Sequence, residues 1–173
     1  MDILTTLTEV IDLRSFSNLW FWIGLAVVWS SASYWVLGVP VDMIQRAKKH
    51  GGQAQADLET VVEVKVRRML HIGQVSGIWI VGFAFFALTA LGILAFGYWL
   101  EFAQALVLIA LPLSLVAARA FATASRIAAH QIAGEDLQRV LMKQRFWTQV
   151  IGVIAVFVTA MFGMYQNLEL GAI

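Results

Sequence analysis

Residues 56–100 read ADLETVVEVKVRRMLHIGQVSGIWIVGFAFFALTALGILAFGYWL, and this stretch decides the fold. Its first part is charged and keeps apolar residues on one helical face, whereas no Asp, Glu, Lys or Arg occurs from Ile72 to Leu100. An apolar run of about 20 residues or more can cross the roughly 30 Å hydrocarbon core of a bilayer. The pattern predicts one long helix that begins near Ala54, just after the turn signal Gly51–Gly52, and then enters a membrane.

The composition of the whole chain points the same way. Of its 173 residues, 60% are hydrophobic and 13% are charged, against about 45–50% and about 25% in soluble domains. A soluble domain of this size cannot bury that surplus, so we expect much of it to face lipid. The absence of cysteine excludes disulfides, thiolate nucleophiles and Cys-ligated metals or clusters. A net charge of only +1 gives no basic excess that would favour nucleic acid as a partner.

Three further stretches lack charged residues, and each is near or above the roughly 20 residues that a span needs. We therefore predict an all-α fold, an integral membrane four-helix bundle formed by the whole chain as a single membrane domain. The expected spans are about 18–39, 72–98, 101–122 and 146–168. Segments 40–71 and 123–145 are expected to form cytoplasmic helical extensions, and residues 1–15 an N-terminal interfacial helix.

The positions of lysine and arginine predict the orientation. Eleven of the twelve fall within 40–71 or 119–145, and segments rich in these residues stay in the cytoplasm. Both termini are then expected on the non-cytoplasmic side. The short segment from Gly97 to Glu101 predicts a tight helical hairpin, and Glu135 and Asp136 are well placed to begin the last helix.

Small residues recur at helical spacing on the predicted spans. Helices in a membrane associate through close packing and hydrogen bonds rather than through hydrophobic collapse. We therefore interpret these residues as a bundle-packing face, formed by Gly24, Ser31, Gly38, Gly73, Gly77, Gly152 and Gly163.

A polar stripe continues the third span beyond its apolar part. Arg119, Thr123, Arg126 and His130 are spaced by four, three and four residues, so they share one helical face. An acidic pair, Glu59 and Glu63, lies on the helix that leads into the second span. The interpretation we favour is intramolecular pairing of these charges. The alternative is a cytoplasmic docking face for an anionic lipid or a partner subunit.

The sequence offers no site for chemistry. No ionisable residue occurs near the centre of a span, which disfavours ion-coupled transport, and no catalytic motif is present. We expect neither an enzyme nor a bound cofactor, but an accessory, scaffold or assembly subunit with a protein partner or self-association. One alternative is an oligomeric permease or channel for a neutral or lipid-like solute, lined by Ser30, Ser31 and Ser33. A lesser alternative is a cofactor-binding protein that uses His71 and His130.

Ordered residues over nearly the whole chain also resemble a family. They are IDLRSFSNLWFWIGLAVVWSSASYWVLGVPVDM at 11–43, followed by HGGQAQADLE, HIGQVSGIW, GYWLEFAQA and MFGMYQNL. This pattern is similar to small four-span proteins of the bacterial inner membrane that are called components of the SufBCD complex, after an iron–sulphur assembly machinery. The resemblance implies an inner-membrane location and a tether for such a complex through the basic cytoplasmic segments. It brings no catalytic or binding residues.

Overall fold

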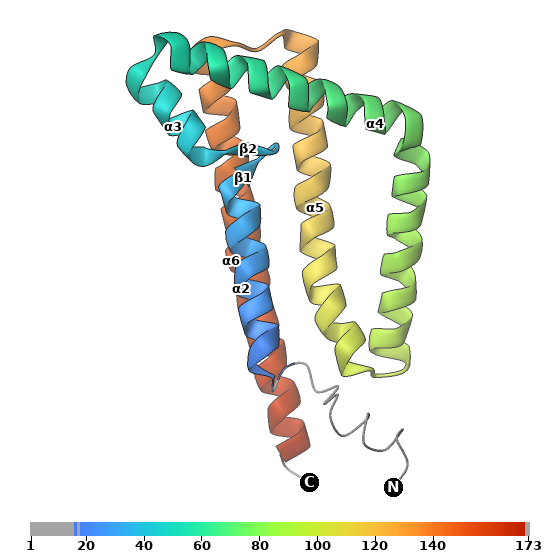
Figure 1. The fold of residues 1–173 in the computed structure, drawn as a ribbon. Helices are drawn as coiled ribbons and strands as arrows, with labels where there is room; N and C mark the ends of the chain where they lie inside the picture. The colour runs from blue at the N-terminus through green and yellow to red at the C-terminus, as the bar shows by residue number, and fades with distance from the viewer. Residues whose placement is uncertain (1–15, 17, 172–173) are drawn as a thin grey trace, which may run out of the picture.

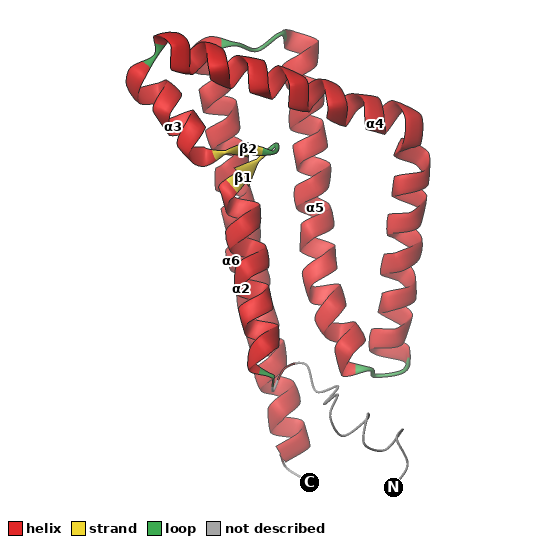
Figure 2. Cartoon of the chain, viewed as in Figure 1, coloured by secondary structure: helices red, strands yellow, loops and turns green. Residues whose placement is uncertain are grey.

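The computed structural model describes Phe16 and residues 18–171. Nearly all of these residues are helical (Figure 2), which confirms the all-α prediction. The predicted interfacial helix over residues 1–15 lies outside the described residues. The elements in chain order are α2 (Leu19–Tyr34), β1 (Trp35–Val36), β2 (Val39–Pro40), α3 (Val41–His50), α4 (Gly52–Gly92), the π-helical turn η2 (Ile93–Gly97), α5 (Glu101–His130) and α6 (Gly134–Gly171).

The helices are arranged in two regions. α2, α5, α6 and the second part of α4 run along a common direction, while α3, the first part of α4 and the α5–α6 turn gather at one end (Figure 1). We call that end the headpiece and define it as residues 35–71 and 120–144. The predicted long helix is present and begins at Gly52, but it changes direction sharply part-way along (Figure 1). The bend lets its charged first part pack across α5 instead of standing out as a straight extension.

Within the described residues, three helices are long and apolar enough to cross a membrane. They are α4 with η2, α5, and residues 134–166 of α6. The fourth predicted span, over 18–39, is not confirmed, because α2 has only 16 residues and measures about 24 Å. Its helix stops at Tyr34, where Trp35–Val36 pairs with Val39–Pro40 in a short antiparallel hairpin.

The hairpin turn explains why the first helix ends early. Leu37 and Gly38 both have positive φ, at 53° and 75°, the geometry of the two-residue turns that join antiparallel strands. A leucine is strained in this conformation, but its side chain is buried in the headpiece core. Burial of Leu37 compensates for the strain, so the helix ends before this residue and the chain turns into the hairpin.

The tight hairpin predicted between Gly97 and Glu101 is confirmed. α4 ends in the π-turn η2 and α5 begins four residues after it. The Gln104 amide nitrogen donates to the Ala95 carbonyl at 3.0 Å, and Gln166 donates to the Gln104 side-chain oxygen. A buried carbonyl without a partner is costly in apolar surroundings, so the buried Gln104 stabilises the irregular turn.

The main hydrophobic core lies in the headpiece rather than between the apolar helices. It combines aliphatic side chains of α3, α4, α5, α6 and the hairpin, namely Val36, Leu37, Val39, Val41, Ile44, Ala47, Leu58, Val62, Val66, Ala124, Ile127, Leu137 and Leu141. A smaller cluster around Leu25, Trp29 and Ala155 joins α2 to α5 and α6.

The small residues of the predicted packing face divide into two groups. A Cβ atom on Gly73 would meet the Phe121 ring at 2.5 Å, one on Gly152 would meet the Trp29 ring at 2.7 Å, and one on Gly163 would meet Phe16 at 3.2 Å. These three glycines allow close approach of an aromatic ring. In contrast, a Cβ on Gly24 or Gly77 would meet no atom within 4 Å.

The remaining two residues of that face also lie outside the contacts between the apolar helices. Ser31 is exposed on α2. Gly38 forms the hairpin turn in the headpiece, where the nearest atom to its Cβ position is in the Lys65 side chain, at 3.5 Å. Gly24 and Ser31 therefore do not pack closely against another helix, and Gly38 lies beside the charged first part of α4 rather than between apolar helices.

Candidate functional site

The charged residues singled out in the sequence all lie in or beside the headpiece, but the structure separates the acids from the cations. Among the described residues, the ion pairs are Arg67–Glu63, Arg139–Glu135 and Arg139–Asp136. Each lies within one helix, so none joins α4 to α5. The favoured prediction, that Glu59 and Glu63 pair with the cations of α5, is therefore wrong.

Glu59 instead holds the start of α6. Its carboxylate accepts hydrogen bonds from the Gly134 backbone nitrogen and from the Gln55 side chain, both at 2.7 Å. These contacts lower the pKa of Glu59, the Gln55 bond more than the Gly134 bond, because both stabilise the ionised carboxylate. Glu59 thus accepts a hydrogen bond from the backbone at the start of α6, where a negative charge is favourable.

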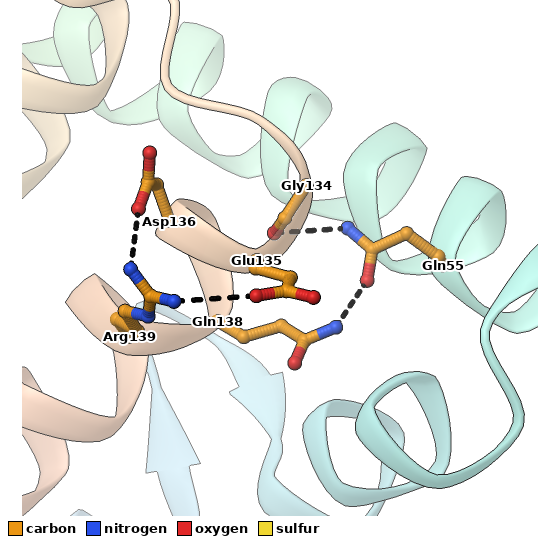
Figure 3. Close-up of polar contacts among 6 residues, drawn as sticks. All are labelled: Gln55, Gly134, Glu135, Asp136, Gln138 and Arg139. Atoms are coloured by element: carbon orange, nitrogen blue, oxygen red, sulfur yellow. Dashed lines mark hydrogen bonds and ion pairs between the residues drawn. The ribbon is translucent and has the colours of Figure 1, made fainter.

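Two glutamines complete this contact. Gln55 also donates to the Gly134 carbonyl at 3.2 Å, and Gln138 donates to the Gln55 side-chain oxygen at 2.6 Å (Figure 3). We call Gln55, Glu59, Gly134 and Gln138 the latch. It fastens the first two turns of α4 to the start of α6 and so fixes the α5–α6 turn in place.

Glu63 has a local role. It forms an exposed pair with Arg67 at 2.9 Å, one helical turn away, as its spacing predicts. Exposed pairs of this kind contribute little to stability. Glu63 also lines an open cavity of about 480 Å³ between α4 and the α5–α6 turn, together with apolar residues such as Val66 and Ile127.

The cations of α5 follow one face of the helix, as predicted. Arg126 and His130 are exposed and line a second open cavity, of about 470 Å³, with Asp136, Arg139 and Val140 of α6. Arg139 is neutralised there by Asp136 at 3.1 Å and Glu135 at 3.2 Å (Figure 3). No carboxylate in the part of the chain that the structure describes pairs with Arg126 or His130, so the charge of Arg126 is left unpaired at this cavity.

Arg119 lies closer to the apolar helices and has a different partner. Its guanidinium carbon is 4.9 Å from the centroid of the Trp147 ring on α6, a cation–π arrangement. Its Nε atom is buried and has no hydrogen-bond partner among the described residues. One turn further along α5, Thr123 donates to Gln144 at 3.0 Å and links the two helices.

Sequence reasoning missed Trp147 and Arg139 as neighbours of the cationic stripe. The signal was available, because α5 and α6 form an antiparallel pair around a short turn at 131–133. Residues counted outward from that turn by similar numbers lie side by side. This counting places Trp147 near Arg119, and Arg139 near Arg126.

The residues of the two alternative functions are not brought together into a site. His71 and His130 are both exposed, and within the described ranges no group of three His, Cys, Asp or Glu residues could hold a metal ion. Ser30 and Ser31 are exposed on α2, and Ser33 is half-buried.

No family model, curated protein or solved structure matches the chain. The resemblance to components of the SufBCD complex therefore stays a prediction.

Proposed function

We propose that the protein is a non-enzymatic accessory, scaffold or assembly subunit of the bacterial inner membrane, which docks a protein partner on its headpiece. The observation that carries the proposal is the cavity lined by Arg126 and His130, neither of which pairs with an acid among the described residues; it lies in a folded headpiece at one end of long apolar helices. The apolar helices would hold the protein in lipid. The headpiece would then present its surface to the cytoplasm, since it contains most of the lysines and arginines.

The chemistry of the cavity indicates the kind of partner. Arg126 and His130 have no acidic counterpart in the described chain, and charge complementarity fixes partner choice and register more than it adds affinity. An acidic segment of a partner would supply the missing carboxylates. The latch holds one wall of the cavity in place, because it fastens the start of α6 to α4.

Affinity purification of the tagged full chain in mild detergent tests this proposal. We expect a stoichiometric partner that is lost at high salt and lost from the Arg126→Glu variant, because the substitution reverses the charge in the cavity. Arg46→Glu is the matched control, since Arg46 is exposed on α3, outside the cavity lining. Recovery of the chain alone at every salt concentration would contradict a docking role.

A further inference from the structure

A third cavity lies between the apolar parts of α5 and α6. It measures about 300 Å³ and is open to the surroundings. Its lining is entirely apolar, and consists of Val107, Leu108, Leu111, Pro112, Leu115, Ile151, Ile154, Ala155 and Val158. We call it the acyl groove. Inside a bilayer, a groove of this composition is filled by hydrocarbon, because no water is present to fill it.

The acyl groove continues into the polar stripe of α5, which begins at Arg119, on the same face of the helix pair. Leu115 lines the groove, and Arg119 follows one turn later on α5. Ile151 lines the groove on the other side, and Trp147 precedes it by one turn on α6. One turn is about 5–6 Å along the axis, so the Arg119–Trp147 pair lies at the headpiece end of the groove.

Arg119 is prepared to bind an anion at that point. The Trp147 ring holds its guanidinium on one side, and no acid neutralises it within the described chain. Its buried Nε atom has no partner there. A guanidinium offers several N–H groups in a planar fork that matches the oxygens of a phosphate. Arginine and tryptophan are also the residues that favour the headgroup level of a membrane.

We propose that this face binds one anionic phospholipid, with an acyl chain in the acyl groove and its phosphate on Arg119. The inference rests on the membrane insertion of the proposed function, but it needs no protein partner. A soluble anion would use Arg119 and leave the groove empty. The carboxylates of an acidic peptide would find a cationic partner at Arg126, but the peptide would find no polar group along the aliphatic groove. A phospholipid matches both halves, because its charged phosphate and its acyl chains are joined in one molecule.

Native mass spectrometry of the full chain in non-ionic detergent, titrated with phosphatidylglycerol, tests the proposal. We expect one tightly bound phosphatidylglycerol and no comparable binding of phosphatidylcholine. Arg119→Gln is expected to weaken binding about tenfold or more, because it removes a charge-assisted contact. Arg119→Lys should recover part of the loss, since it restores the charge without the fork. Arg46→Gln is the matched control and should bind as the unmodified chain does.

A second variant separates a lipid from a free anion. Leu111→Trp keeps Arg119 but fills the groove with a larger side chain, and Leu111 is exposed, so the substitution should not disturb folding. We expect Leu111→Trp to weaken phosphatidylglycerol binding as well. Unchanged binding in Leu111→Trp, with competition by inorganic phosphate, would show a simple anion site and overturn the proposal.

Two further outcomes would also overturn it. One is equal loss of lipid from Arg119→Gln and Arg46→Gln, which would mean unspecific attraction by surface charge. The other is loss of a protein partner, with lipid binding intact, from Arg119→Gln. Each variant is checked first for monodisperse elution and unchanged helical content. Partner capture with Arg126→Glu provides a separate readout, so failure of the lipid site and failure of the docking function remain distinguishable.

Discussion

The headpiece and the apolar helices of this protein differ in whether their apolar side chains are buried inside the chain. In the headpiece, aliphatic side chains such as Leu58 and Leu141 are 0% exposed, as in the core of a soluble domain. In the second part of α4, Ile78 is 84% and Phe83 is 72% exposed. Removal of apolar side chains from water drives the packing of the headpiece. The exposed side chains of α4 would instead be surrounded by lipid tails, which are as apolar as they are, so they need no contact with another helix. The headpiece therefore holds the ends of the long helices together.

The largest expected effect comes from comparing two side-chain truncations, one in the headpiece and one on α4. Leu141→Ala should lower the free energy of unfolding by about 2–5 kcal/mol, because it opens a cavity in a packed core. Phe83→Ala should change it by less than about 0.5 kcal/mol, because the ring contacts little of the chain. Denaturant unfolding in detergent, followed by circular dichroism, measures both. Equal losses would mean that α4 is packed as tightly as the headpiece.

Contacts between the apolar helices are few, so each should matter where it occurs. Gly152→Ala would place a methyl group 2.7 Å from the Trp29 ring and is expected to cost about 1–3 kcal/mol through overpacking. Gly77→Ala is the control, since its methyl group would meet no atom; a gain of about 0.5–1 kcal/mol is expected from the loss of helical glycine. Thermal unfolding compares the two, and a neutral Gly152→Ala would argue against the α2–α6 contact.

The hydrogen bonds of Gln104, at the other end of these helices, should contribute a similar amount to stability. Gln104→Leu leaves the Ala95 carbonyl and the Gln166 amide without the partner they have now, a loss of about 1–3 kcal/mol. Gln149→Leu changes an exposed position and should leave the stability almost unchanged. Hydrogen exchange of the amides in η2 would locate the effect, and unchanged exchange would show that the turn does not need Gln104.

The smallest effect concerns the latch and depends on pH. The pKa of Glu59 is lowered in the folded chain, so its contribution is present above the ordinary glutamate pKa and disappears as the pH falls through the lower, folded value. Glu59→Gln should therefore unfold slightly more easily than the unmodified chain near neutral pH, and this difference should vanish in acid. Unfolding midpoints measured across that range check the sign. A difference that grows in acid would contradict it.

Local signals predicted the ends of the helices well. Gly51–Gly52 indicated the start of α4, and Glu135 and Asp136 indicated the start of α6. These signals are reliable because they act through the nearest backbone groups. The spacing of Glu63 and Arg67 predicted their pair for the same reason.

What the sequence missed depends on tertiary contacts. Residues 35–39 are apolar and uncharged, so hydropathy does not separate a helix from a strand there; burial of Leu37 and Val39 in the headpiece decides it. The bend in α4 has the same origin, because it brings Val62 and Val66 onto α5. Glu59 was assigned to a cation, but the backbone of Gly134 on α6 lies nearer.

The most direct test of the account uses the absence of native cysteine. Single cysteines at Lys49 in the headpiece and Phe83 on α4, both exposed in the structure, are labelled with a membrane-impermeant maleimide in right-side-out and inside-out vesicles. We predict that Lys49→Cys reacts only in inside-out vesicles, and that Phe83→Cys reacts in neither until the membrane is dissolved. Rapid labelling of Phe83→Cys in intact vesicles would contradict the proposed lipid-facing position of the second part of α4.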